Sequence, residues 1–322
     1  MNNERDKFLK NCILEYKVGS HLYGTNTPTS DEDFSGVFIA PIEYYLGLGH
    51  VEECDFSHVS KLENGKNAPD AVDFKLYELR KFVKLAMENN PNILEQLWVP
   101  TDKVTFSTVM GEELLKNRHL FPHKGAKQKF LGYAYSQRHK MRVKPDNLEA
   151  LLAFSDYVGN LLEVSPEMKH QFLAVFQTSN DFQKLAKFNR DNCKVGDLTF
   201  HLSKKLAPTL KCVNARIEKA GSRQELWLKH GYDTKFASHL IRLMLEGQEL
   251  LLTGEIQFPL KYAETILDIK KGLWTMEDVI TYSEELEKDI QNIDKESSLP
   301  AKPRYAEIEN LLVTMVREYH GL

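Results

Sequence analysis

One segment near the N-terminus, residues 19–36, combines the residue types that phosphate and metal chemistry need. It reads GSHLYGTNTPTSDEDFSG and follows a strand-like apolar stretch at residues 13–18. A Gly-Ser turn that opens a helix offers backbone N–H groups and a hydroxyl to phosphate oxygens. Gly19 and Ser20 are therefore candidate nucleotide-binding residues.

The same segment ends in two aspartates, Asp31 and Asp33, at the start of the β-rich run 34–40. Side chains alternate along a strand, so residues i and i+2 point to the same side. Two adjacent carboxylates repel each other unless a cation lies between them, and hard oxygen ligands favour Mg²⁺. The alternative is an ordinary solvated turn, because aspartate is common in turns.

The surrounding elements predict an α+β fold. The run 72–77 alternates like a strand, with Asp73 on its polar side. From about residue 111 the pattern is helical, so we expect a small mixed-sheet domain at 1–110 and a larger all-helical domain at 111–322 that closes the active-site cleft. The predicted helices are 111–118, 126–142, 147–163, 167–177, 222–229, 234–252, 260–271, 276–293 and 304–319.

The predicted helix 234–252 is apolar nearly all round, which indicates burial. Lys235, His239 and Arg242 fall in one narrow polar stripe at 100° per residue. Such a stripe suits a phosphate group, and we expect it to face the carboxylates across the cleft. The alternative is a solvent-facing stripe in which Arg242 pairs with Glu246 at i,i+4.

Residues 124–144 form a basic segment without acidic residues, in which aromatic side chains are interleaved. Such a segment is a candidate RNA-binding face, although aromatic residues at helical spacing are more often core and charges more often a solvated face. The expected RNA contacts are Lys127, Lys129, Arg138, Lys140 and Arg142.

Composition limits the possible classes of protein. The chain has 322 residues, a net charge of −4 and 42% hydrophobic residues, which is ordinary for a globular protein of about two domains. No apolar run is long enough to span a bilayer, and the charged N-terminus does not resemble a secretion signal. Four widely spaced cysteines form no CxxC pair. We therefore expect a reduced, cytoplasmic protein that does not bind membranes.

The order Gly-Ser, then Asp-x-Asp at a strand, resembles the signature of the DNA polymerase beta nucleotidyltransferase superfamily. The longer string GSHLYGTNTPTSDEDFSGVF is similar to predicted nucleotidyltransferases of bacterial and phage RNA-repair systems. The resemblance implies a third carboxylate on a neighbouring strand. Asp73 fits this position best, and Asp70 and Asp55 are its competitors.

The resemblance implies transfer of a nucleoside monophosphate from an NTP to a hydroxyl, with two Mg²⁺ ions (or Mn²⁺) held by Asp31, Asp33 and Asp73. The expected acceptor is the 3′ end of an RNA, such as a tRNA under repair. Two alternatives remain open: a transferase that modifies a protein or small molecule, and a non-catalytic nucleotide or RNA sensor.

Overall fold

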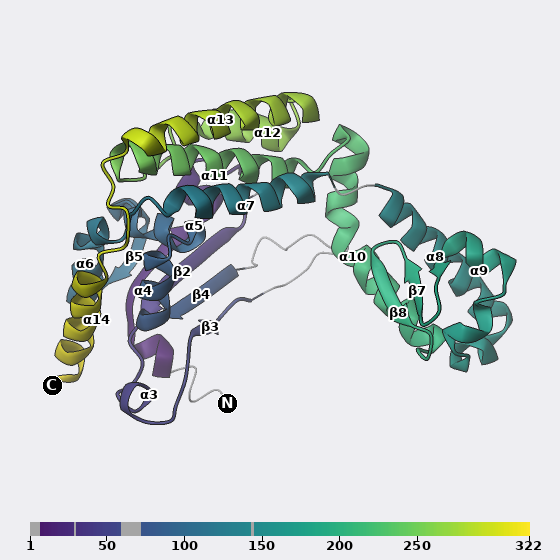
Figure 1. Cartoon of the computed structure of the whole chain (residues 1–322). Helices are drawn as coiled ribbons and strands as arrows, with labels where there is room; N and C mark the ends of the chain where they lie inside the picture. Colours follow the sequence, from purple (N-terminus) through teal and green to yellow (C-terminus); the bar gives the residue numbers. More distant parts are fainter. Residues whose placement is uncertain (1–6, 29, 59–71, 143–144) are drawn as a thin grey trace. The chain divides into compact units, whose positions relative to one another are not determined.

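The computed structural model describes residues 7–28, 30–58, 72–142 and 145–322. The chain divides into two compact units (Figure 1). Unit 1 consists of Met1–His139 and Thr234–Leu322, and unit 2 consists of Lys140–Asp233.

The centre of unit 1 is a mixed five-stranded sheet. Its strands are β1 (Cys12–Val18), β2 (Glu32–Phe38), β3 (Glu53–Asp55), β4 (Val72–Glu78) and β5 (Val104–Ser107), in the order β3-β4-β2-β1-β5. β2 and β4 run parallel, and the other neighbouring pairs run antiparallel. The strands predicted at 13–18, 34–40 and 72–77 are confirmed as β1, β2 and β4, with shifts of one or two residues at their ends.

Helices cover this sheet and supply most of the remaining core. Figure 1 shows α7, α11 and α13 as one layer of unit 1. All but seven residues of α11 are buried, as its all-round apolar sequence predicts. The helical segments of unit 1 are α2 (Ser20–Tyr23), α3 (Glu43–Leu46), α4 (Leu79–Met87), α5 (Pro91–Leu94), η1 (Glu95–Trp98), η2 (Thr101–Lys103), α6 (Val109–Lys116), η3 (Arg118–Leu120), α7 (Ala126–Met141), α11 (Thr234–Thr253), α12 (Ala263–Lys271), α13 (Met276–Glu296) and α14 (Tyr305–His320).

Unit 2 packs helices around its own small sheet and has a separate apolar core. Its elements are α8 (Pro145–Val164), η4 (Pro166–His170), η5 (Leu173–Phe176), α9 (Asn180–Leu185), β6 (Lys187–Phe188), β7 (Asn192–Val195), β8 (Leu198–His201) and α10 (Leu206–His230). The three strands form an antiparallel sheet in the order β6-β7-β8.

The α+β fold class is confirmed, but three details within unit 2 differ from the prediction. The predicted helix 167–177 is two short 3-10 turns, because residues 171–174 form backbone hydrogen bonds with 202–206. The predicted helix 222–229 is only the end of α10, because Pro208 lies in the first turn of α10, where a missing N–H is tolerated. The β6-β7-β8 sheet was not predicted.

The two units also divide the chain differently from the expected domains 1–110 and 111–322. The expected boundary lies inside α6, whose Gly111 packs directly against the backbone of β1 at Ile13. Among the described residues, no helix is long and apolar enough to cross a membrane.

Close packing between strands gives a first testable prediction. A Cβ on Gly36 in β2 would lie 2.4 Å from the carbonyl oxygen of Leu14 and 2.7 Å from Cδ2 of Leu76. Gly36→Ala is therefore expected to lower the free energy of unfolding by about 2–3 kcal/mol. The matched control is Gly132→Ala in α7, where a Cβ meets nothing within 4 Å. The control is expected to gain about 0.4–1 kcal/mol through the unfolded state. Equal stability of the two variants in urea unfolding would contradict this packing.

Candidate active site

Three carboxylates meet where the parallel strands β2 and β4 begin, at one end of the unit 1 sheet. Asp33 on β2 and Asp73 on β4 are direct neighbours in the parallel register, and Asp31 lies two residues before Asp33. Burial, followed by the negative charges of Asp31 and Asp73, raises the pKa of Asp33 to about 6. Asp31 and Asp73 therefore both lie within electrostatic range of Asp33, and a bound cation would relieve the repulsion among the three carboxylates.

Gly19 brings the turn after β1 against this cluster. Its φ is +66°, and a Cβ at this position would lie 2.4 Å from Oδ2 of Asp33. A side chain is excluded by both the conformation and the space. The carbonyl of Gly19 accepts hydrogen bonds from the N–H groups of Leu22 and Tyr23, and Ser20 is the first residue of α2. The expected Gly-Ser turn that opens a helix is therefore present beside Asp33.

Ser57, which no sequence motif indicated, orients the third carboxylate. Its Oγ donates to Oδ1 of Asp73 at 2.8 Å and accepts from the N–H of Phe74 at 3.1 Å. Asp55, the competitor for the third carboxylate, accepts from the N–H of Ser57 and lies on β3, one strand further from Asp33 than Asp73 does. The other competitor, Asp70, lies outside the described residues.

Two lysines lie within electrostatic range of the carboxylates. The ammonium of Lys270, at the end of α12, is half-buried and is attracted by Asp31 and Asp33. Burial, followed by the positive charge of Lys235, lowers the pKa of Lys270. The hydroxyl of Thr234 donates to the backbone carbonyl of Lys270 at 3.0 Å, which holds the start of α11 against the end of α12. Lys235 was expected here, but Lys270 was missed because a lysine near a helix end carries no signal of its own.

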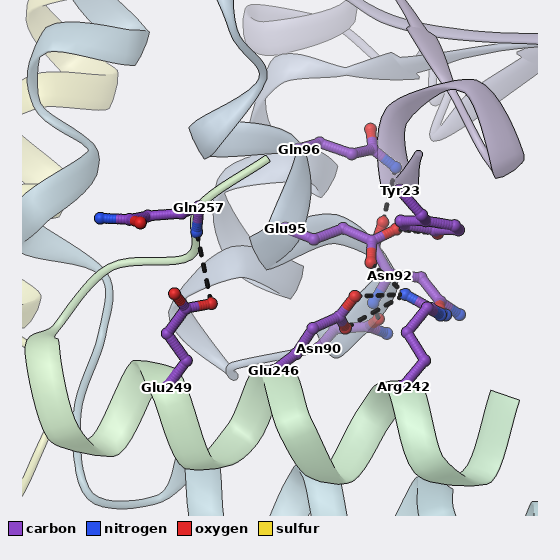
Figure 2. Close-up of polar contacts among 9 residues, drawn as sticks. All are labelled: Tyr23, Asn90, Asn92, Glu95, Gln96, Arg242, Glu246, Glu249 and Gln257. Atoms are coloured by element: carbon purple, nitrogen blue, oxygen red, sulfur yellow. Dashed lines mark hydrogen bonds and ion pairs between the residues drawn. The ribbon is translucent and has the colours of Figure 1, made fainter. Parts of the chain in front are cut away.

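The other two residues of the predicted stripe lie in different surroundings. His239 is exposed, one turn after Lys235 on α11. Arg242 is buried, and its Nη1 donates to Oε2 of Glu95 at 2.6 Å and to Oε1 of Glu246 at 2.8 Å. Figure 2 shows this cluster. Because two carboxylates already engage the guanidinium, Arg242 is placed as a structural cation rather than beside Lys235 as a phosphate ligand.

The Arg242 cluster extends to the Gly-Ser turn. The guanidinium stacks on the ring of Tyr23, 4.2 Å from its centroid, and the Tyr23 hydroxyl donates to Oε1 of Glu95 at 2.8 Å. The next residue after Glu95, Gln96, accepts hydrogen bonds from Tyr16 on β1 and Ser35 on β2. One polar network therefore joins α2, α11 and the central strands through η1.

The basic segment 124–144 is largely engaged within the protein. Lys127 pairs with Asp294, and Arg138 donates to Ser283, both on α13. Lys129 pairs with Glu88 at 3.6 Å. These three of the five expected RNA contacts bind other side chains, and Lys140 also has an interaction within the protein. Lys140 and Arg142 are exposed and belong to unit 2.

The donor set fits a hard divalent cation. Among the described residues, no three His, Cys, Asp or Glu side chains already converge as the ligands of one ion. Mg²⁺ does not need such a cage, because it binds through one or two carboxylates and takes its other ligands from water and substrate phosphates. Asp31 and Asp33, with Asp73 beside them, match that requirement in number and chemistry.

Comparison with known proteins agrees with this geometry. Residues 3–172, just over half of the chain, match the model of the RNA repair pathway DNA polymerase beta family. The chain belongs to this family. The match includes β1 to β5 and all three carboxylates, and it confirms the superfamily that the segment 19–36 suggested. This member therefore has a nucleotidyltransferase-type sheet domain and a helical C-terminal region.

Two other proteins resemble this member of the family. An uncharacterized 38.9 kDa protein in the nrdC-mobD intergenic region of Enterobacteria phage T4 is 29% identical in an alignment of 320 residues. The alignment covers 90% of this chain and 91% of that protein. The crystal structure of a nucleotidyltransferase-like protein from Exiguobacterium sibiricum 255-15 aligns with 99% of this chain and 76% of its own, at 10% identity and a TM-score of 0.27. A TM-score this low is no basis for inferring shared detail.

The buried Arg242 cluster gives a second prediction. Arg242→Met leaves Glu95 and Glu246 buried without a counter-ion, so we expect a loss of about 3–5 kcal/mol of unfolding free energy. This loss is expected to shrink as the pH falls, because protonation removes the buried charge. Urea unfolding at several pH values measures both effects, and a pH-independent loss would contradict the assignment.

Glu246→Gln is the matched control, because it keeps the shape of the side chain and removes one charge. Burial raises the pKa of Glu246 above its ordinary value of 4.5. The folded protein therefore binds this proton more tightly than the unfolded chain does, and wild-type stability falls as the pH rises above 4.5. In Glu246→Gln this part of the pH dependence is expected to disappear.

Proposed function

We propose that this protein is a metal-dependent nucleotidyltransferase that transfers a nucleoside monophosphate from an NTP to the 3′ hydroxyl of an RNA. The observation that carries the proposal is the juxtaposition of three carboxylates at the start of the neighbouring strands β2 and β4: Asp33, Asp73, and Asp31 just before β2. They lie next to a Gly-Ser turn and within electrostatic range of the cations Lys235 and Lys270. Phosphoryl transfer depends mainly on positioning and charge neutralisation, and these groups supply both.

The carboxylates would bind two divalent ions, Mg²⁺ or Mn²⁺. When bound, such ions neutralise the triphosphate and lower the pKa of an attacking hydroxyl. Asp31 and Asp33 would hold the ions at the start of β2. Asp73, which Ser57 orients, would accept a hydrogen bond from the acceptor hydroxyl and receive its proton.

The Gly-Ser turn and the two lysines would bind the triphosphate. Gly19 allows the backbone to approach the Asp33 carboxylate closely, and Ser20 offers a hydroxyl at the start of α2. Lys235 and Lys270 would bind the β- and γ-phosphates and stabilise the charge on the departing pyrophosphate. His239, exposed one turn further along α11, would contact the nucleotide or the acceptor strand.

RNA is the proposed acceptor because the family takes its description from RNA repair. A cleaved tRNA would present a suitable 3′ hydroxyl. NTPs and tRNA are both cytoplasmic, which agrees with the location expected from the sequence. A protein or small-molecule acceptor, or nucleotide binding without transfer, would be revealed by the following experiment.

The third prediction concerns the carboxylates. The purified protein is incubated with Mg²⁺, each α-labelled NTP, and intact or nicked tRNA. We expect label on RNA from the wild type, and a decrease of about 100-fold or more in Asp33→Asn. The control is Asp102→Asn in η2, which changes an exposed carboxylate that pairs with Lys103 outside the three-carboxylate cluster, and it is expected to keep full activity. Label on added protein alone would favour a modifying enzyme, and equal activity of Asp33→Asn would refute the metal site.

The fourth prediction separates Lys270 from its neighbour. Lys270→Gln is expected to raise KM for the NTP and lower kcat, together by about tenfold or more, because a half-buried cation beside Asp33 is lost. Lys271→Gln is the control, since Lys271 is exposed and adjacent in sequence. Steady-state kinetics of the two variants measures the difference. If both variants matched the wild type, the triphosphate would bind elsewhere.

A further inference from the structure

Charge is distributed unequally between the two units. Unit 2 contains 15 Lys and Arg against 11 Asp and Glu, a net charge of +4, whereas unit 1 has a net charge of −8. The excess in unit 2 is concentrated in residues 184–216, which hold eight basic residues and two acidic ones. The basic residues are Lys184, Lys187, Arg190, Lys194, Lys204, Lys205, Lys211 and Arg216.

Part of this charge lies on one face of the β6-β7-β8 sheet. Cys193, Val195 and Phe200 point into the core of unit 2. The alternate residues Lys187 and Lys194 are exposed, and they lie directly opposite each other on β6 and β7. Like charges in this position destabilise a sheet. A bound polyanion would relieve the repulsion between these two lysines, so the surface is suited to bind one.

Some basic residues of unit 2 form ion pairs, but those of the β6-β7 hairpin do not among the described residues. Lys184 pairs with Asp181, and Arg216 pairs with Asp197. Among the described residues, no acidic side chain forms an ion pair with Lys187, Arg190 or Lys194. Arg190 is exposed in the turn that joins β6 to β7. The hairpin therefore presents three available cations, unlike α7, whose basic residues contact α13 and Glu88.

An exposed aromatic ring accompanies the basic residues of unit 2. Phe172 is 48% exposed, and Nζ of Lys205 lies 5.9 Å from the centre of its ring. Residues 172 and 205 are joined by a β-bridge, so the ring is attached to the segment that continues from β8. A cation next to an exposed aromatic face can contact both the phosphate and the base of a nucleotide. This combination favours a nucleic acid over an acidic protein.

We propose that the outward face of the β6-β7-β8 sheet, together with Phe172 and Lys205, binds the sugar–phosphate backbone and an unpaired base of the acceptor RNA. This inference rests on the proposed function for the nature of the acceptor. Lys187, Arg190 and Lys194 contact the phosphates, and Phe172 stacks on a base. The surface carries affinity for RNA without sequence readout.

The test measures binding of a fluorescein-labelled hairpin RNA with a single-stranded 3′ tail to the full chain, by anisotropy between about 50 and 200 mM KCl. Lys194→Glu is expected to weaken binding about tenfold and to lower the salt slope by about one. It also creates an opposite-charge pair with Lys187, so the variant should be at least as stable as the wild type. A loss of RNA binding without loss of stability excludes misfolding as the cause.

Two further variants complete the design. Lys116→Glu on α6 makes the same charge change on an exposed residue of unit 1 and is expected to bind RNA like the wild type. Phe172→Ala is expected to weaken binding about fivefold with an unchanged salt slope, because stacking releases no counter-ions. Polyglutamate is added as a competitor, and we expect it to displace RNA only at a large excess of charge.

The outcomes distinguish this inference from the proposed function. If the wild type binds RNA and Lys194→Glu binds it equally well, this surface is not the RNA site, although RNA can remain the acceptor. If polyglutamate displaces RNA at equal charge, the surface fits an acidic protein equally well and the assignment to RNA is wrong. If the wild type does not bind RNA, both this inference and the RNA acceptor fail, while transfer to another acceptor is still measurable.

Discussion

The geometry of the candidate site depends on one buried cation, Arg242. Its guanidinium lies between Glu95 and Glu246 and above the ring of Tyr23. A buried ion cluster adds little net stability, but removal of one partner leaves a charge without compensation. The cluster therefore fixes the positions of three elements more than it strengthens the fold. Tyr23 ends the helix that Ser20 begins, and Lys235 lies two turns before Arg242 on α11. The same contact thus sets the separation of the Gly-Ser turn from the cationic start of α11.

Both sides of the site consist of like charges. Asp31 and Asp73 raise the pKa of Asp33, and Lys235 lowers the pKa of Lys270. The negative charge of the aspartates and the positive charge of the lysines partly offset each other across the site, but within each group the charges have the same sign. A metal–triphosphate complex carries both signs, with cations for the carboxylates and phosphate oxygens for the lysines. Such a complex relieves both repulsions at once, so the site is more complementary to the complex than to either component.

Sequence reasoning succeeded where the determinants were local. The i, i+2 spacing predicted that Asp31 and Asp33 lie together, as they do although Asp31 precedes β2, and the family resemblance placed Asp73 beside them. Helical periodicity put Lys235 and Arg242 in one stripe but could not show that Arg242 meets Glu95, 147 residues away, and so is drawn away from Lys235. Lys270 and Ser57 were missed for the same reason, because their roles arise only from tertiary contacts. Strands as short as β6 have too few residues for a detectable period.

Counting charges along the chain favours α7 as the RNA-binding face, whereas the tertiary contacts favour the β6-β7 hairpin. The basic residues of α7 form the denser linear cluster, but two of them are bound by α13, Lys127 by Asp294 and Arg138 by Ser283. In the β6-β7 hairpin, short connections and register bring Lys187 and Lys194 together with no described acidic partner. Unit 1 is itself acidic, so its overall field repels a polyanion and attracts it only at the local cations of the site. Under the proposed function, most of the affinity for RNA would come from a separate basic surface, and the described residues of unit 2 provide one.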